Sequence, residues 1–372
     1  ARYGEAEQYF RQSLALAQRF KSPRNTARAQ VNFGSLLVQQ GRAGEGAIQV
    51  SQALDFYRQG NYRQEAALAQ ALVGRAASLR GQYDEARRIF EGLLQDATKQ
   101  NNPSRQALAQ QDLGVMLAAQ ERYPEALTFL EQRERISRAQ GNQRGVAYAM
   151  PEQGHVLWRL GRDGEARSRF DQASAIASAQ SGGKITEVLI DTELGRAELA
   201  LAYRQFAVAR SFAARALTEE EATTRRVTVK IKTAVVDCLA QAFAGTARTG
   251  LGRCEQAVRT AEESGSLGLL PGARLALARA RLAAGDAAGA LSAALEAQSD
   301  FGQRGQLASE HLAWLVAAHA AELSGDTARS VEYNARAADV QSRLQQLWGT
   351  DNLNSYLTRP DVQAYRTILR AK

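Results

Sequence analysis

The chain has 372 residues, 45% of them hydrophobic and 23% charged, so it can bury a core and is not a disordered polymer. Its 47 lysines and arginines exceed its 39 aspartates and glutamates, and this excess is spread along the sequence, which is typical of a solvated surface. No apolar stretch approaches the roughly 18 residues of a membrane span, so we expect no membrane insertion in this segment.

The residue types favour helix from end to end. The apolar share is dominated by alanine and leucine, and arginine, glutamine and glutamate supply much of the polar share; all five are good helix formers. Six prolines is a low number for this length. We therefore expect an all-α protein.

The first predicted element is a single helix that contains Tyr3, Ala6 and Phe10. These residues match the second helix of the repeat described next, and the first helix has no counterpart. We therefore expect the sequence to be a piece of a larger protein. The incomplete N-terminal repeat would leave an apolar end uncovered, which makes homo-oligomer formation there a hypothesis.

From residue 33 the sequence repeats every forty residues without gaps. Each repeat has a small residue inside a first helix, a turn residue, a small residue inside a second helix and then a large apolar residue. In the first four repeats these positions are Gly34, Gly41, Gly46 and Val50; Gly74, Gly81, Ala86 and Phe90; Gly114, Glu121, Ala126 and Leu130; and Gly154, Gly161, Ala166 and Phe170. Glycine inside a helix costs about 1 kcal/mol relative to alanine, so its recurrence in phase indicates close helix packing.

This pattern resembles the tetratricopeptide repeat, in a longer version than the commonest one. The resemblance implies a right-handed superhelical solenoid of antiparallel helix pairs in which the first helix of each pair lines a concave groove. We place four further repeats at Ala197, Ala209 and Ala213; at Gly245, Gly252, Ala257 and Ala261; at Ala278, Gly285, Ala290 and Ala294; and at Ala318, Gly325 and Ser330.

The repeats are expected to end near residue 338. Residues 1–338 then form one repeat domain, a half repeat followed by about eight full repeats, and residues 339–372 form a C-terminal helical cap. We expect one cap helix from Asp339 to about Trp348 and a last one from Pro360 or Asp361. The tail resembles the C-terminal repeat region of bacterial multidomain signalling proteins such as serine/threonine kinases.

The sequence contains no recognisable catalytic or cofactor motif. Its three histidines, His155, His311 and His319, form no metal-binding motif, and phosphate-binding and nucleophile-elbow patterns are absent from the sequence. We expect no enzyme activity, no metal and no cofactor. Cys238 and Cys254 are expected to lie roughly 20 Å apart on opposite helices of one pair, as buried thiols.

The best candidate for a binding site lies on the concave face of the first helices. Tyr148, His155 and Trp158 share one face of a helix that Pro151 should kink, and tyrosine and tryptophan are typical interface anchors. Packing between neighbouring repeats is the alternative reading of these residues. The candidate partner-binding residues are Arg75, Gln111, Tyr148, Pro151, His155 and Trp158.

The sequence thus predicts a non-catalytic scaffold or sensory repeat domain of a larger bacterial signalling protein, with a protein or peptide in its groove. Binding of nucleic acid or another acidic partner through the arginine-rich surface is the alternative, and sparse aromatic residues make nucleic acid the less favoured ligand. We expect a cytoplasmic location, or an extracytoplasmic one if a preceding segment carries a membrane anchor.

Overall fold

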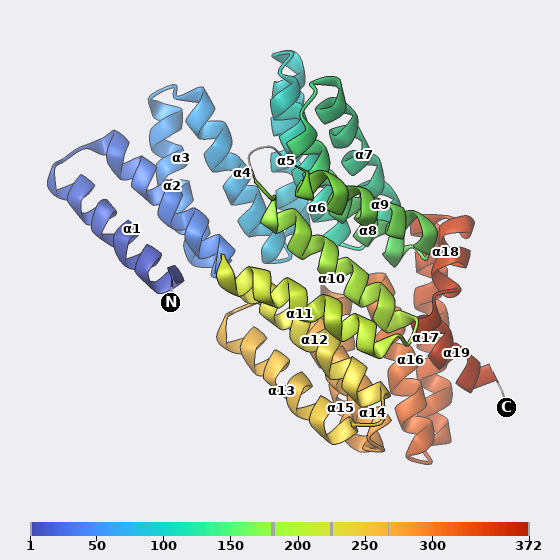
Figure 1. Cartoon of the computed structure of the whole chain (residues 1–372). Helices are drawn as coiled ribbons and strands as arrows, with labels where there is room; N and C mark the ends of the chain where they lie inside the picture. The colour runs from blue at the N-terminus through green and yellow to red at the C-terminus, as the bar shows by residue number, and fades with distance from the viewer. Residues whose placement is uncertain (1, 180–182, 224–225, 267, 371–372) are drawn as a thin grey trace.

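The computed structural model describes the chain except residues 1, 180–182, 224–225, 267 and 371–372, and the regular structure of the described part is entirely helical (Figure 1). The helices are α1 (Arg2–Arg19), α2 (Pro23–Gln39), α3 (Ala43–Gln59), α4 (Arg63–Leu79), α5 (Tyr83–Lys99), α6 (Pro103–Ala119), α7 (Tyr123–Ala139), α8 (Gln143–Arg159), α9 (Asp163–Ser178), α10 (Thr186–Ala202), α11 (Phe206–Ala222), α12 (Val227–Phe243), α13 (Ala247–Glu263), α14 (Leu270–Ala283), α15 (Ala287–Gln303), α16 (Leu307–Leu323), α17 (Thr327–Trp348), α18 (Thr350–Leu357) and α19 (Pro360–Arg370).

After α1, the helices form successive antiparallel pairs from α2/α3 to α16/α17. Each even-numbered helix from α2 to α14 also contacts the next even-numbered helix. This second set of contacts places the even-numbered helices on the inner side of the curve, where neighbouring repeats converge. The predicted all-α superhelical solenoid is therefore confirmed, and its concave face is built from the even-numbered helices.

The phased glycines hold the two helices of a pair in close contact, as the repeat pattern predicts. A Cβ atom added to Gly154 would lie 2.5 Å from Cε1 of Phe170, and one added to Gly114 would lie 2.7 Å from Cγ of Leu130. Gly34 and Gly74 meet Val50 and Phe90 in the same way. In these pairs one partner must lack a side chain so that the other can be large.

The sixth repeat departs from the predicted register. Gly245 is the turn residue, with φ +91°, and Gly250 in α13 is the small residue that packs against the backbone of Cys238 and Ala242. The predicted register is therefore wrong by seven positions. Cys238 stands at the phased small position, and Cys254 stands at the position of the large apolar partner.

The two cysteines are consequently adjacent, in contrast to the predicted separation. Their Cα atoms are 5.2 Å apart, both side chains are fully buried, and they form a disulfide. They are 16 residues apart in sequence, the same separation as Gly154 and Phe170. A covalent bond between two medium-sized side chains thus replaces the glycine and large-residue contact of the first four repeats.

The turns between helices place one residue each in the left-handed region. Glycine occupies most of these positions, among them Gly41, Gly81 and Gly161. Glu121 and Arg204 are the exceptions among the described turns from an even-numbered to the next odd-numbered helix, with φ of +60° and +57°. A left-handed backbone costs a residue with a side chain roughly 1–2 kcal/mol, so another interaction must offset this at Glu121.

Glu121 provides that interaction by capping a helix far away in sequence. Its carboxylate accepts hydrogen bonds from the backbone N–H of Ala308 (2.7 Å) and Ser309 (3.0 Å) and from the Ser309 hydroxyl. These N–H groups belong to the first turn of α16, which lacks intrahelical acceptors. The Trp348 indole N–H donates to the Glu121 carbonyl (2.8 Å). We call Glu121, Ser309 and Trp348 the closure contact.

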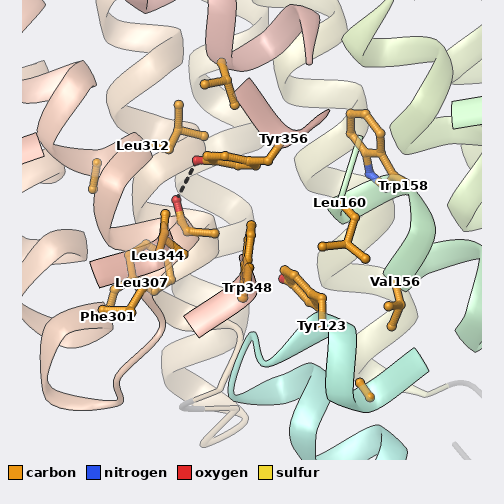
Figure 2. Close-up of a cluster of buried hydrophobic side chains, with 14 of the residues drawn as sticks. Tyr123, Val156, Trp158, Leu160, Phe301, Leu307, Leu312, Leu344, Trp348 and Tyr356 are labelled. Atoms are coloured by element: carbon orange, nitrogen blue, oxygen red, sulfur yellow. Dashed lines mark hydrogen bonds between the residues drawn. The ribbon is translucent and has the colours of Figure 1, made fainter. Parts of the chain in front are cut away.

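The closure contact lies beside a hydrophobic cluster that joins distant parts of the superhelix. This cluster contains buried side chains from residues 77–202 and from residues 275–365. Figure 2 shows Tyr123, Trp158 and Leu160 beside Trp348, Tyr356 and Leu307. Figure 1 places α18 next to α8 and α9. The C-terminal repeats and tail therefore pack against the middle of the solenoid.

The tail differs from its prediction in one element. No helix begins at Asp339, because α17 runs unbroken from Thr327 to Trp348 and ends at Gly349, whose φ is +77°. The cap proper consists of α18 and α19, and the boundary at residue 338 falls inside a helix. The division into domains at this residue stays a prediction.

Candidate binding groove

The groove side of the even-numbered helices carries polar side chains that connect neighbouring repeats. Arg75 of α4 forms a two-point ion pair with Asp112 of α6, with N–O distances of 2.7 and 3.2 Å. Gln111 stands next to Asp112 and is half-buried. Burial raises the pKa of Asp112, and the Arg75 guanidinium opposes that shift.

Helices α8 and α10 are joined by three such contacts. The Tyr148 hydroxyl donates to Glu187 (3.3 Å), His155 Nε2 lies 3.2 Å from the Asp191 carbonyl, and Arg159 forms an ion pair with Glu198 (3.0 Å). These residues are half-buried.

The carboxylates of this region form an acidic patch on α8 and α10. Burial raises the pKa of Glu152, and the nearby Asp191 carboxylate raises it further. Burial also raises the pKa of Asp191, against the opposing effect of Arg226 and Lys232. Burial also raises the pKa of Glu198, but Arg159 lowers it, and His155 and Lys232 act in the same direction as Arg159. The pKa of Glu198 is therefore lowered overall. Burial lowers the pKa of His155 to about 4, so this imidazole is neutral at pH 7.

The structure brings some of the predicted site residues together and separates others. Tyr148 and His155 lie on the groove side of α8 and face α10. Trp158 is 2% exposed and lies under the Arg359 guanidinium, whose Cζ atom is 4.1 Å from the centroid of the Trp158 ring. Pro151 is buried within α8, which continues through it, and the predicted kink stays a prediction. Arg75 is exposed and lies two repeats away from this cluster.

Several groove residues escaped the sequence analysis, although a regular signal marks them. The residue that follows the phased small position points into the groove in several repeats. Arg75 and His155, which were selected from the concave face, both follow a phased glycine, and the same rule selects Glu198, Arg279 and His319, which follow Ala197, Ala278 and Ala318. Asp191 carries no such signal, because it contacts α8 and α12 across repeats.

Within the described ranges, no group of three or more His, Cys, Asp or Glu side chains could hold a metal ion. No described helix is long and apolar enough to cross a membrane. Along the concave face, ion pairs and hydrogen bonds between neighbouring repeats fix the positions of polar side chains.

Comparison with known proteins finds likeness in part of the sequence and in the fold. Residues 65–139 match the family model of the tetratricopeptide repeat. A search of curated proteins finds no match.

Solved structures share the fold over most of the chain. A Rap conjugation gene regulator of plasmid pLS20 in complex with the Phr* peptide matches with a TM-score of 0.62 and 12% identity, over 93% of this chain and 96% of that one. A Rap protein complexed with Competence and Sporulation Factor matches with a TM-score of 0.58 and 12% identity, over 82% of this chain and 87% of that one. NprR in complex with its cognate peptide NprX matches with a TM-score of 0.58 and 11% identity, over 92% of this chain and 97% of that one. At these identities the likeness shows the fold alone.

Proposed function

We propose that this chain is a non-catalytic sensory scaffold that holds a peptide or protein segment in its concave groove, as part of a bacterial signalling protein. The observation that carries the proposal is the groove itself, where side chains of successive repeats present ordered polar groups on α4, α6, α8 and α10. Two of the structures that share this fold are complexes with peptides, a Rap regulator with the Phr* peptide and NprR with its cognate peptide NprX.

The acidic patch gives the proposed ligand a chemistry. Asp191 lies near Glu152 on the adjacent helix and disfavours the ionised form of Glu152, and Glu187 and Glu220 disfavour the ionised form of Asp191. A cationic group placed between Glu152 and Asp191 would relieve this repulsion and gain charge-assisted hydrogen bonds. We therefore propose that the ligand presents a lysine, arginine or free amino terminus to α8 and α10.

A peptide array probed with the purified chain tests this function. We expect binding of basic peptides, and a loss of at least tenfold in affinity in the Tyr148→Ala/His155→Ala variant, which removes two groove groups that face α10. The matched control is Arg135→Ala on α7, an odd-numbered helix, where the side chain is 75% exposed. Equal binding by the double variant and the control would reject this groove as the site.

The described surface gives the alternative of nucleic-acid binding less support. Many arginines pair with carboxylates, and Arg274 alone lies within 4 Å of Glu262, Glu296 and Asp300. Such pairs neutralise the charge that would attract phosphates. Self-association through the N-terminal half repeat stays a prediction; Tyr9 of α1 and Phe20, which follows α1, are 70% and 74% exposed.

We keep a cytoplasmic location as part of the proposal. Disulfides are uncommon in that compartment, so the redox state of Cys238 and Cys254 in cells is a direct test. Cells quenched with acid and then alkylated under denaturing conditions, which expose the buried side chains, should yield two modified thiols. Persistence of the disulfide under quenching would contradict a cytoplasmic location.

A further inference from the structure

The start of α19 lies on the same groove face that the repeat phase defines. Tyr365 accepts a hydrogen bond from Nε of Arg279 in α14 (3.3 Å), and its ring centroid is 6.2 Å from that of His319 in α16. Arg279 and His319 occupy the same repeat position as the groove residue His155. The chain therefore places a helix of its own in the C-terminal part of its groove.

Arg359, the residue before α19, anchors the helix to α8. Its side chain is 4% exposed and stacks on Trp158, which is also a groove position. Its Nη1 donates to the Arg159 carbonyl (3.1 Å) at the last turn of α8, where the helix dipole favours a cation. Its Nε and Nη2 donate to the two carboxylate oxygens of Asp361 (3.1 and 2.8 Å).

The apolar side of the segment completes the contact. Val362 is fully buried and Tyr365 is 7% exposed, and both belong to the cluster that contains Leu312 and Leu315 of α16. Residues 359–365, which we call the tail segment, therefore have three anchors: a stacked arginine, a paired aspartate and an aromatic ring four residues after it. This is the pattern of a helical peptide bound in a groove.

We propose that the groove surface formed by Trp158, Arg279 and His319 is a binding site for a helical segment that begins with Arg-Pro-Asp and carries an aromatic residue four positions after the aspartate, and that the tail segment is its resident occupant. A partner of this chemistry binds by displacing the tail. The inference deepens the proposed function, since it assigns a second part of the same groove.

Tethering explains how such an occupant controls access. A segment linked to its own site acts at an effective concentration on the order of 1 mM, so a free peptide with equal contacts is excluded while the tail is bound. Weakening the tail must then open the site to a peptide added in trans. If the tail were a permanent structural cap, a peptide added in trans would not replace it.

The experiment uses the full chain and a labelled peptide of residues 356–370, followed by fluorescence anisotropy. In the Arg359→Ala variant the tail loses its stacking and its pair with Asp361, and we expect the peptide to bind at least tenfold more tightly than to the wild type. The control Arg336→Ala removes a 62% exposed arginine of α17 and should behave as the wild type. A peptide with alanine in place of its arginine and aspartate should not bind.

Circular dichroism and the melting temperature establish that Arg359→Ala is folded. If it is, absence of peptide binding overturns the proposal, as does equal binding to the wild type. If it does not fold, hydrogen exchange of the wild type decides: peptide at about 1 mM should speed exchange of the amides of residues 361–366 severalfold, whereas a scrambled peptide should not. Unchanged exchange overturns the proposal.

This outcome is separable from that of the proposed function, because the probe is the chain's own sequence. If the array yields no ligand while the tail peptide binds Arg359→Ala, the proposed function fails alone. If array ligands bind the wild type and Arg359→Ala equally and the tail peptide binds neither, this inference fails alone.

Discussion

The repeats from α2 to α9 and those from α10 to α17 reach the same hairpin geometry by different means. In the first group a glycine faces a large side chain, as in Gly154 and Phe170. In the second group two smaller side chains meet: alanines at Ala278 and Ala294, and the disulfide of Cys238 and Cys254. Both arrangements let the two helices of a pair approach closely, because the facing side chains are both small or one of them is absent.

The two groups also differ in what covers their groove. On α4 to α10 the polar groups of neighbouring repeats pair with one another, whereas on α14 and α16 they meet the tail. The second region carries the closure contact as well. The second region therefore holds distant repeats together and also binds the tail helix. Substitutions in the second region should consequently lower the stability of the whole superhelix.

Acid should weaken the second region through His311. Burial, with a contribution from Arg366, lowers the pKa of His311 to about 3, and the imidazole donates from Nδ1 to Tyr356 Oη (3.0 Å), which itself donates to the Ala308 carbonyl. The folded state resists protonation that the unfolded state accepts below its ordinary pKa near 6.5. Stability is therefore lost as pH falls from about 6.5 towards 3, by about 3 kcal/mol at pH 4.

Urea denaturation at pH 7 and pH 4 measures this loss. The variant His311→Gln keeps a hydrogen-bond donor near Tyr356 but has no proton to gain, so its stability should fall less between the two pH values. Equal losses in the wild type and the variant would assign the pH dependence to other groups.

Reduction of the disulfide is the next largest expected effect. The bond closes a loop across the α12–α13 turn, and its loss should lower the free energy of unfolding by roughly 2–3 kcal/mol. Chemical denaturation with and without reductant checks this. The double variant Cys238→Gly/Cys254→Leu recreates the pair of Gly114 and Leu130, and it should fold and be insensitive to reductant. A double variant that fails to fold would show that the two kinds of pair are not interchangeable.

Glu121 tests the closure between the regions. Glu121→Ala removes the cap of α16 and keeps the left-handed strain, and should cost about 2 kcal/mol. Glu121→Gly also removes the cap but relieves the strain, so it should cost about 1 kcal/mol less than Glu121→Ala. Arg204→Gly is the matched control at the equivalent turn, and it should be neutral or slightly stabilising. Thermal unfolding compares the three, and an alanine variant of Glu121 as stable as the wild type would deny the cap any role.

The features that the sequence predicted are those fixed within one repeat. The phased glycines, the large residues that face them and the turn glycines determine the helix pairs, and the solenoid follows. The sixth repeat failed because Gly245 was assigned to the helix interior when it occupies the turn, and this displaced the cysteines by two helical turns.

The contacts between distant repeats could not be predicted in the same way. Glu121 and Ala308 are 187 residues apart, and Arg359 and Arg159 are 200 apart. Such contacts depend on the pitch of the whole superhelix, to which every repeat contributes a small rotation. For the same reason the sequence could not show that Trp158, a predicted partner-binding residue, is covered by Arg359 of the tail. One local clue existed: Glu121 replaced glycine at a turn where glycine is favoured.

The smallest expected effect concerns the packing pairs themselves. Gly154→Ala brings a methyl group to 2.5 Å from the Phe170 ring, and the ring is fully buried and cannot turn aside freely. The overpacking should outweigh the gain in helix propensity and leave a net loss of about 1 kcal/mol. Gly92→Ala in α5 is the matched control, because a Cβ atom there has nothing within 4 Å, and it should stabilise by about 0.5–1 kcal/mol. Thermal melts of the two variants should therefore shift in opposite directions. A shift in the same direction would mean that helix propensity, and not the contact with Phe170, determines the cost at Gly154, and the contrast between the two groups of repeats would then lose its physical basis.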